Sequence, residues 1–318
     1  MNISSYLKSW VTLQLGAWVL CLGSLGFLSF TTQAQEPRPT ESLTPSTNIV
    51  IVGDTGSGSK GQLAVANAMQ QWHAQHPFQT VLHLGDIIYP IGDVDTWGDA
   101  YYKKPYAPLF NQGVQFLVTL GNHDYLYFKG KKAIKYYGMP NNYYKRTVAT
   151  LPTGKQVEAF VLDTNALTPT QLRWFEQQLK ASTATWKIAY AHHPLNTSGQ
   201  HAADPLVKQA RTLLLPLLQK YQVDVYLSGH DHQYERFDTQ AFGGPLAIIS
   251  GGGGASLRKM AKQQPGSEVF RSLHHFMNLS IQPTVLQFEA LDTAGQRFDC
   301  VQLVKATPHA WATTQPCS

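Results

Sequence analysis

No run of five or six consecutive Lys and Arg residues occurs in the 318-residue chain, although its formal net charge is +5. Such runs are typical of proteins that follow the phosphate backbone of a long nucleic acid, so no nucleic acid partner is expected. The densest basic cluster, KGKK at residues 129–132, has two interpretations: a solvated loop, or a local attraction for an anionic substrate. The chain also has no internal repeat.

The first 34 residues have the features of an export signal. Lys8 precedes a mostly apolar stretch from Trp10 to Phe30, and two small residues, Thr32 and Ala34, precede a possible cleavage point after Ala34. The sequence therefore predicts a signal peptide at 1–34 and a protein exported to the periplasm or the extracellular space, without stable membrane insertion after cleavage. Because the apolar stretch is about 21 residues long, an uncleaved membrane anchor is the alternative.

Cysteine is scarce in this chain. It has three cysteines, and cleavage of the leader would remove Cys21. The other two, Cys300 and Cys317, make a plausible disulfide because an exported protein meets an oxidising compartment. After the leader, residues 35–46 are rich in Pro, Ser and Thr and are predicted to be a flexible spacer.

Hydrophobic residues make up 43% of the chain, which is enough for a large core. Strands are predicted at 49–52, 80–84, 116–120, 157–162, 187–191, 223–227, 246–250, 275–281, 284–291 and 297–303, and helices at 60–72, 167–179 and 204–221, the last interrupted by Pro216. Strands that alternate with helices, and then follow one another alone, predict an α/β fold (α+β mixed) of two packed mixed β-sheets flanked by helices.

Five predicted strands end in side chains that can bind a metal ion. The clearest is TVLHLGDIIY at 80–89, a core strand that stops at Gly85 and is followed by a carboxylate and then a phenol. The candidates are Asp54; Asp86 with Tyr89; Asn122; His192; and His230 with His232. Alone, the motifs at Asp54, Asn122 and His192 have simpler interpretations as a turn or loop, whereas two histidines at 230 and 232 after an apolar strand have few packing explanations. Because ligands gather at the carboxyl ends of strands in such folds, the five together predict one site.

The donor types indicate a pair of metal ions. Carboxylate, imidazole, phenolate and amide oxygen suit Fe, Zn or Mn rather than metals that prefer thiolate. One ion cannot use all seven candidates. Divided around a bridging Asp86, they make two sites with open positions for water and substrate, an arrangement that serves in-line attack on phosphate esters.

The ordered motifs GDTG, GDIIY, GNHD, AHHP and GHDH resemble those of the calcineurin-like metallophosphoesterase superfamily, and specifically of its purple acid phosphatase branch. Asp-x-Gly in the first motif and Tyr89 in the second narrow the resemblance to that branch, and the single-domain length is similar to its small tartrate-resistant members. The resemblance spans residues 47–292. It implies a four-layer αββα sandwich, with a catalytic domain at 47–305 and a C-terminal tail at 306–318.

The resemblance also implies which residue binds which ion. Asp54, Asp86, Tyr89 and His232 would hold Fe(III), and Asp86, Asn122, His192 and His230 would hold a divalent Fe, Zn or Mn ion. His192 is preferred to His193 because the family's histidine precedes Pro by two residues. His193 would then cap or orient the loop.

Two further histidines resemble groups on the substrate side of the family's site. His123 and His201 stand where this branch has histidines that contact phosphate or protonate the leaving group; the alternative for His123 is a role in orienting a ligand. Asp124 is expected to accept a hydrogen bond from a ligand or from His123. The remaining histidines are predicted to be structural, packing or surface residues: His73, His76, His83, His274, His275 and His309.

The function expected from this resemblance is that of an exported phosphatase, which hydrolyses small phosphate monoesters by attack of a metal-bound hydroxide, without a covalent phosphoenzyme. One alternative is a phosphodiesterase that uses the same site on cyclic nucleotides or other diesters. A second alternative is a non-catalytic or redox iron-binding protein. Nothing in the sequence indicates an oligomeric state.

Overall fold

A computed structural model describes residues 47–126, 130–238, 242–307 and 310–317. The predicted signal peptide and spacer at 1–46 lie outside the described residues, as do Lys129 and His309. Within the described part of the chain, no helix combines the length and the apolar character needed to cross a membrane.

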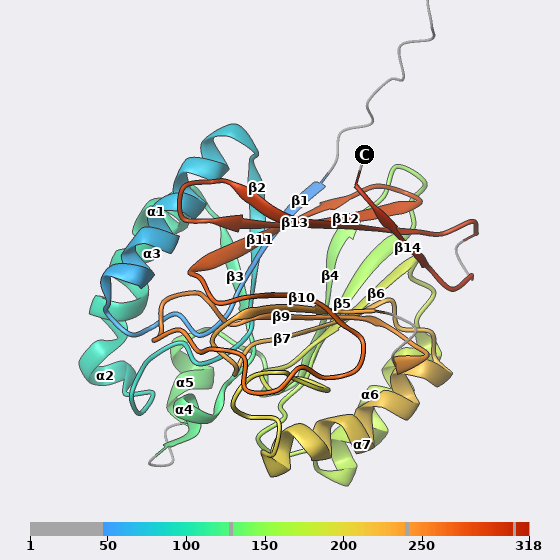
Figure 1. The fold of residues 1–318 in the computed structure, drawn as a ribbon, viewed down its shortest axis with the longest axis horizontal. Coiled ribbons are helices and arrows are strands. Elements are labelled where there is room, and N and C mark those ends of the chain that lie inside the picture. Colours follow the sequence, from blue (N-terminus) through green and yellow to red (C-terminus); the bar gives the residue numbers. More distant parts are fainter. Residues whose placement is uncertain (1–46, 127–129, 239–241, 308–309, 318) are drawn as a thin grey trace, which may run out of the picture. The chain divides into compact units, whose positions relative to one another are not determined.

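Two seven-stranded mixed sheets form the centre of the described part of the chain, from residue 47 onward (Figure 1). The first has the order β14 (Thr313–Pro316), β13 (Arg297–Val304), β12 (Val285–Asp292), β11 (His275–Ile281), β1 (Thr47–Val52), β2 (Phe78–His83) and β3 (Gln115–Val118). The second has the order β10 (Ser267–Arg271), β8 (Tyr234–Phe237), β9 (Leu246–Ser250), β7 (Val225–Ser228), β6 (Trp186–Tyr190), β5 (Gln156–Val161) and β4 (Tyr144–Thr150).

The strands that precede the candidate ligands are parallel. β1, β2 and β3 run parallel in the first sheet, and β5, β6, β7 and β9 run parallel in the second. The remaining strands pair antiparallel. In the first sheet these are β11 to β14, and in the second they are β4 at one edge and β8 and β10 at the other. Parallel strands bring their carboxyl ends to one edge of a sheet, and this explains why the candidate ligands can meet.

Helices flank both sheets (Figure 1). They are α1 (Lys60–Gln75), α2 (Val94–Trp97), the π-helical turn η1 (Gly98–Lys103), α3 (Lys104–Phe110), α4 (Asn122–Tyr125), α5 (Gly130–Tyr136), α6 (Pro169–Ala181) and α7 (Pro205–Lys220). One buried cluster joins apolar side chains of both sheets and α1, and a second joins the second sheet to α6 and α7. The predicted fold class is therefore confirmed: two mixed sheets with helices outside.

Several local features differ from the sequence-based expectation. Pro216 lies inside α7 without interrupting it, and residues 130–132 of the basic cluster begin the helix α5 rather than a loop. The segment predicted as a C-terminal tail contains β14, which pairs with β13. Next to it, the expected disulfide between Cys300 and Cys317 is present, with 5.7 Å between the Cα atoms.

Candidate metal centre

The predicted ligands come from the carboxyl ends of strands in both sheets. Asp54, Asp86 and Asn122 follow β1, β2 and β3, while His192 follows β6 and the pair His230 and His232 follows β7. Backbone hydrogen bonds tie the ligand loops together: the N–H of Asp54 donates to the Gly85 carbonyl at 3.0 Å, and the N–H of Gly229 donates to the His192 carbonyl at 3.0 Å.

Tyr89 marks the centre of the first ligand group. Its hydroxyl oxygen lies 3.1 Å from Asp54 Oδ1, 2.9 Å from Asp86 Oδ2 and 3.0 Å from His232 Nε2. His232 Nε2 is also 3.5 Å from Asp54 Oδ1. The four residues expected to share one ion therefore direct one donor atom each to the same point.

Asn122 marks the second group. Its Oδ1 atom lies 3.1 Å from His192 Nε2 and 3.1 Å from His230 Nδ1, and those two nitrogens are 3.3 Å apart. His192 Nε2 lies 3.4 Å from Asp86 Oδ2, the same oxygen that meets Tyr89. Two donors that each stand about 2.1 Å from one ion are about 3.0–3.4 Å apart at right-angled to tetrahedral geometry, so both groups fit a metal ion.

The backbone is strained at three of the seven ligands. Four non-glycine residues of the described chain have positive φ, and three of them are Asp54 (57°), Asp86 (50°) and His230 (72°). Each such conformation costs about 1–3 kcal/mol and is typical of functional sites. The fold therefore holds these side chains in place at an energetic cost.

The glycines of the motifs are needed because the loops approach one another closely. A Cβ atom at Gly121 would lie 2.0 Å from Asp86 Oδ1, and one at Gly229 would lie 2.3 Å from Asp54 Oδ2. Any larger residue at these positions would displace a carboxylate. This explains why the motifs GNHD and GHDH begin with glycine.

Each ligand imidazole is oriented through its second nitrogen. His192 Nδ1 lies 2.9 Å from the Leu84 carbonyl and His232 Nδ1 lies 2.8 Å from the Ser256 carbonyl. His230 Nε2 lies 3.1 Å from the Asp204 carboxylate. Such acceptors fix the tautomer and leave the other nitrogen free to bind a metal.

Asp204 was not predicted from the sequence. It is the N-cap residue of α7, where its Oδ1 atom accepts the Leu206 N–H at 2.7 Å. The Asp-Pro pair before a helix indicates a cap. It gives no sign of the contact with His230, which is 26 residues away in the chain.

Burial and neighbouring charges shift the pKa values of the carboxylates and of one imidazole at the site. Burial and the neighbouring Asp86 raise the pKa of Asp54. Burial alone would also raise the pKa of Asp86, but the adjacent His192 outweighs it and holds that pKa below its usual value. Burial disfavours a charged imidazole, yet Asp86 and Asp54 raise the pKa of His192 to about 10. Two buried carboxylates, Asp54 and Asp86, thus favour a positive charge on the imidazole of His192. A metal cation can supply that positive charge in place of the proton, so the electrostatics of the site suit a metal ion.

His123 and His201 lie beside this centre. His123 packs its ring 4.5 Å from the Tyr89 ring, and its Nε2 atom is 4.0 Å from Asp86 Oδ2. His201 has its ring 4.1 Å from that of His230, and its Nδ1 atom is 2.9 Å from Oδ1 of the fully buried Asp231. Asp231 was not predicted, because within GHDH it looks like a spacer between two ligands.

Asp124 and His193 take other partners. The Asp124 carboxylate accepts the backbone N–H groups of Gly121 at 2.9 Å and of Ile87 at 3.1 Å, and burial raises its pKa to about 7. It therefore fixes the loops that carry Asp86 and Asn122, rather than receiving a bond from His123. His193 Nδ1 lies 2.8 Å from the Thr164 hydroxyl, so His192 and not His193 faces Asp86.

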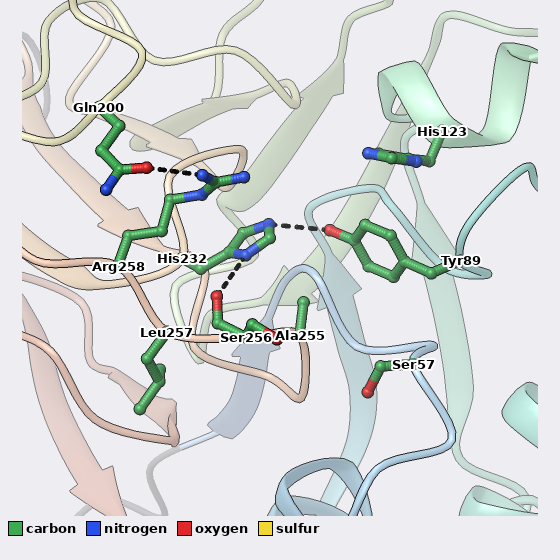
Figure 2. Close-up of a pocket in the computed structure, with 9 residues that line it drawn as sticks. All are labelled: Ser57, Tyr89, His123, Gln200, His232, Ala255, Ser256, Leu257 and Arg258. Carbon is green, nitrogen blue, oxygen red and sulfur yellow. Dashed lines mark hydrogen bonds between the residues drawn. The ribbon is translucent and has the colours of Figure 1, made fainter.

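A pocket of about 400 Å³ opens beside the centre (Figure 2). It is lined by Ser57, Tyr89, His123, Gln200, His232, Ala255, Ser256, Leu257 and Arg258. Tyr89 and His232 are themselves predicted metal ligands, and His123 lies next to a third, Asp86. The loop from Ala255 to Arg258 was not predicted to take part.

Comparisons with known proteins identify the family of the chain. The model of the calcineurin-like phosphoesterase family matches residues 47–234. A tartrate-resistant acid phosphatase type 5 from Mus musculus is 26% identical, over 88% of this chain and 95% of its own.

Two solved structures share the fold. They are a purple acid phosphatase from yellow lupin (TM-score 0.70, 21% identity, 82% of this chain and 54% of that chain) and GAP50, the anchor in the inner membrane complex of Plasmodium (TM-score 0.72, 19% identity, 83% and 90%). Its motifs resemble those of the purple acid phosphatase branch, to which relatives at 26–28% identity are assigned by name. Because the family model covers more than half of the sequence, this chain belongs to the calcineurin-like phosphoesterase family.

Proposed function

We propose that this protein hydrolyses small phosphate monoesters at a site of two metal ions. Asp54, Asp86, Tyr89 and His232 would hold Fe(III); Asp86, Asn122, His192 and His230 would hold a divalent Fe, Zn or Mn ion. The observation that carries the proposal is the shared position of Asp86 Oδ2, which lies 2.9 Å from the Tyr89 hydroxyl of one group and 3.4 Å from His192 Nε2 of the other.

When bound, the two ions supply an activated water as nucleophile and positive charge for the phosphate. The chain's own residues do the rest. His201 is oriented by Asp231 through Nδ1, which leaves Nε2 free to carry a proton to the leaving-group oxygen. His123 lies on the pocket wall with Nε2 toward Asp86, where it can contact a phosphoryl oxygen.

The similarity to proteins named acid phosphatases favours monoesters over diesters. The fold alone does not decide the matter, because the anchor protein GAP50 shares it. A complete donor set with two adjacent histidines supports hydrolysis over a redox or purely structural role.

The decisive experiment compares p-nitrophenyl phosphate with bis(p-nitrophenyl) phosphate. We expect the monoester to be hydrolysed faster, and we expect Asp86→Ala and Asn122→Ala to abolish turnover while the protein is still produced. Asp99→Ala, at an exposed position away from the ligands, is the control. Unchanged turnover in either ligand variant would sink the two-metal site, and faster cleavage of the diester would move the protein to the phosphodiesterase alternative.

Export is the second part of the proposal. It rests on the features of residues 1–34 and on the disulfide, since such bonds persist in oxidising compartments. The N-terminal sequence of the mature protein checks it: cleavage after Ala34 is expected, and an intact Met1 in the membrane fraction would favour the anchor instead.

A further inference from the structure

The loop after β9 is tied to the metal-binding loops. Its glycine run, residues 251–254, lies against the first sheet: the N–H of Gly253 donates to the Gly53 carbonyl at 3.0 Å, and the N–H of Ala255 donates to the Asp54 carbonyl at 2.9 Å. A Cβ atom at Gly253 would lie 2.3 Å from that Gly53 carbonyl oxygen. The run therefore serves to bring the following residues close to the site.

The next residues are fixed on His232. His232 Nδ1 donates to the Ser256 carbonyl at 2.8 Å, and the N–H of Arg258 donates to the His232 carbonyl at 3.0 Å. Both bonds join the loop to a predicted metal ligand. The backbone of Arg258 is thereby held beside the pocket.

The guanidinium of Arg258 has few partners. Nη1 donates to Gln200 Oε1 at 2.7 Å, and Nε is buried without a hydrogen-bond partner. Among the described residues, no carboxylate pairs with Arg258. The side chain as a whole is half-buried on the pocket wall, so its cationic head remains able to pair with an anionic ligand in the pocket.

The guanidinium lies across the pocket from the substrate-side histidine. Figure 2 shows Arg258 and Gln200 on one side of His232, with Tyr89 and His123 on the other. No hydrogen bond joins the Arg258 side chain to any of the predicted metal ligands in the described chain. The pocket thus has a metal end and a cationic end, and its volume of about 400 Å³ exceeds that of one phosphate group.

The charge of the loop is uniformly positive. Between residues 251 and 267 the charged residues are Arg258, Lys259 and Lys262, with no acidic residue among them. The next carboxylate, Glu268, pairs with Arg236. Such a segment favours the approach of anions to the loop that carries Arg258.

We propose that Arg258 binds a second anionic group of the substrate, so that the preferred substrates are phosphate monoesters whose alcohol carries a carboxylate or a further phosphate. This inference rests on the proposed function, because the phosphoryl group must occupy the metal end. A planar guanidinium can make two parallel hydrogen bonds to either oxyanion.

Binding of non-hydrolysable ligands tests the proposal without turnover. Titration calorimetry on the metal-loaded protein compares phosphonoacetate, 3-phosphonopropionate and 4-phosphonobutyrate with alkylphosphonates of the same length. The three chain lengths are used so that no distance between the metal end and the cationic end of the pocket has to be assumed. We expect at least one phosphonocarboxylate to bind about tenfold tighter than its matched alkylphosphonate, as one added charge-assisted bond allows. In Arg258→Gln this ratio should fall to about one. In Lys259→Gln, a charge-matched change at the exposed neighbour, it should persist.

The proposal is overturned if the affinity ratio between the phosphonocarboxylate and its matched alkylphosphonate is the same in Arg258→Gln as in the wild type. This holds both when neither ligand loses affinity and when the two lose it equally. Equal loss for both would mean that Arg258 contacts the transferred phosphoryl group itself. Hydrolysis rates of phenyl phosphate and 4-carboxyphenyl phosphate separate failure of this inference from failure of the proposed function. If the wild-type protein hydrolyses neither ester but the binding ratio depends on Arg258, the anion site stands and the phosphatase assignment fails.

Discussion

The hydroxyl of Tyr89 lies 2.9 Å from Oδ2 of Asp86, which precedes it by three residues in the same loop. Positive φ angles at Gly85 (91°) and Asp86 (50°) turn the chain as it leaves β2. Both side chains consequently face the same point. The same carboxylate oxygen also meets His192 from the other sheet, so one residue links both donor groups.

Loss of Asp86 should therefore deplete both metals. Asp86→Asn keeps the size of the side chain but removes the charge shared by the two groups. We expect metal analysis to find both ions reduced, while Asp54→Asn loses chiefly the iron and Asn122→Ala chiefly the divalent ion. Asp99→Asn repeats the chemical change at an exposed position and should retain both. Retention of both ions by Asp86→Asn would exclude a bridging role.

Tyr89 should determine the colour of the protein. A tyrosinate bound to Fe(III) absorbs visible light, and the Tyr89 hydroxyl is the phenol that meets Asp54, Asp86 and His232. Tyr89→Phe should abolish a violet-to-pink absorption band of the iron-loaded protein while the fold is kept. Tyr101→Phe, a ring stacked on Trp97, should keep the band. A wild-type protein that is active, iron-free and colourless would contradict the assignment of Fe(III).

His201 should matter most for poor leaving groups. If its Nε2 atom supplies a proton, His201→Gln should lower kcat on an alkyl phosphate by about 10²-fold or more, and should affect p-nitrophenyl phosphate much less. Asp231→Asn should give the same pattern more weakly, because Asp231 orients the ring. His123→Gln, which would remove the proposed phosphate contact instead, should slow both substrates alike. Equal losses in His201→Gln would argue against proton donation.

Asp204 should support the divalent site through His230. Its hydrogen bond from His230 lowers the pKa of Asp204, so a charged acceptor faces the imidazole N–H. Asp204→Asn keeps an equally good helix cap but loses that charge, and Asp204→Ala loses both. We expect both variants to bind the divalent ion about tenfold or more weakly.

The capping role of Asp204 has its own control. Thr168→Ala removes the N-cap of α6, where the Thr168 hydroxyl accepts the Gln171 N–H at 3.2 Å. This change should cost about 1 kcal/mol of unfolding free energy without altering metal affinity. Full metal affinity in Asp204→Asn would show that the carboxylate serves only the helix.

The candidate ligands could be predicted because each follows a short apolar strand directly. Parallel strands bring such ends together whatever the connections between them, so local patterns located Asp54, Asp86 and His192. Asp204, Asp231 and Arg258 escaped prediction because their roles depend on contacts with residues distant in the chain. The sequence context of Asp204 indicates only a helix cap and that of Asp231 only a spacer, and Arg258 stands in none of the five motifs.

Some local expectations failed for the same reason. The basic residues at 130–132 favour a loop, and Pro216 favours a break in a helix. Packing of α5 and α7 against the rest of the fold outweighs both preferences. The sequence indicates Asp124 as an acceptor for a ligand or for His123, whereas in the structure two backbone N–H groups occupy its carboxylate.

The final prediction concerns stability at acid pH and a residue outside the metal centre. His275 is fully buried, with Nδ1 3.0 Å from the Leu273 carbonyl and Nε2 3.0 Å from the Ser250 hydroxyl. Burial lowers its pKa from 6.5 to about 4. Between these two values the unfolded chain binds a proton at His275 and the folded chain does not. The free energy of unfolding should therefore fall as the pH drops from about 6.5 to about 4, by up to about 1.4 kcal/mol per pH unit from this group.

His275→Asn removes the titration and keeps a donor near the position of Nδ1. At pH 8 both states of the wild-type histidine are neutral, so the stability difference between the variant and the wild type measures the loss of packing and of the hydrogen bond with Ser250, without any contribution from titration. That difference should shrink as the pH is lowered from 7 to 4, because only the wild type pays for excluding the proton. Chemical denaturation of both proteins across this range provides the measurement, and contributions from the metal centre cancel in the difference. A gap that stays constant with pH would mean that His275 is protonated in the folded protein as readily as in the unfolded chain.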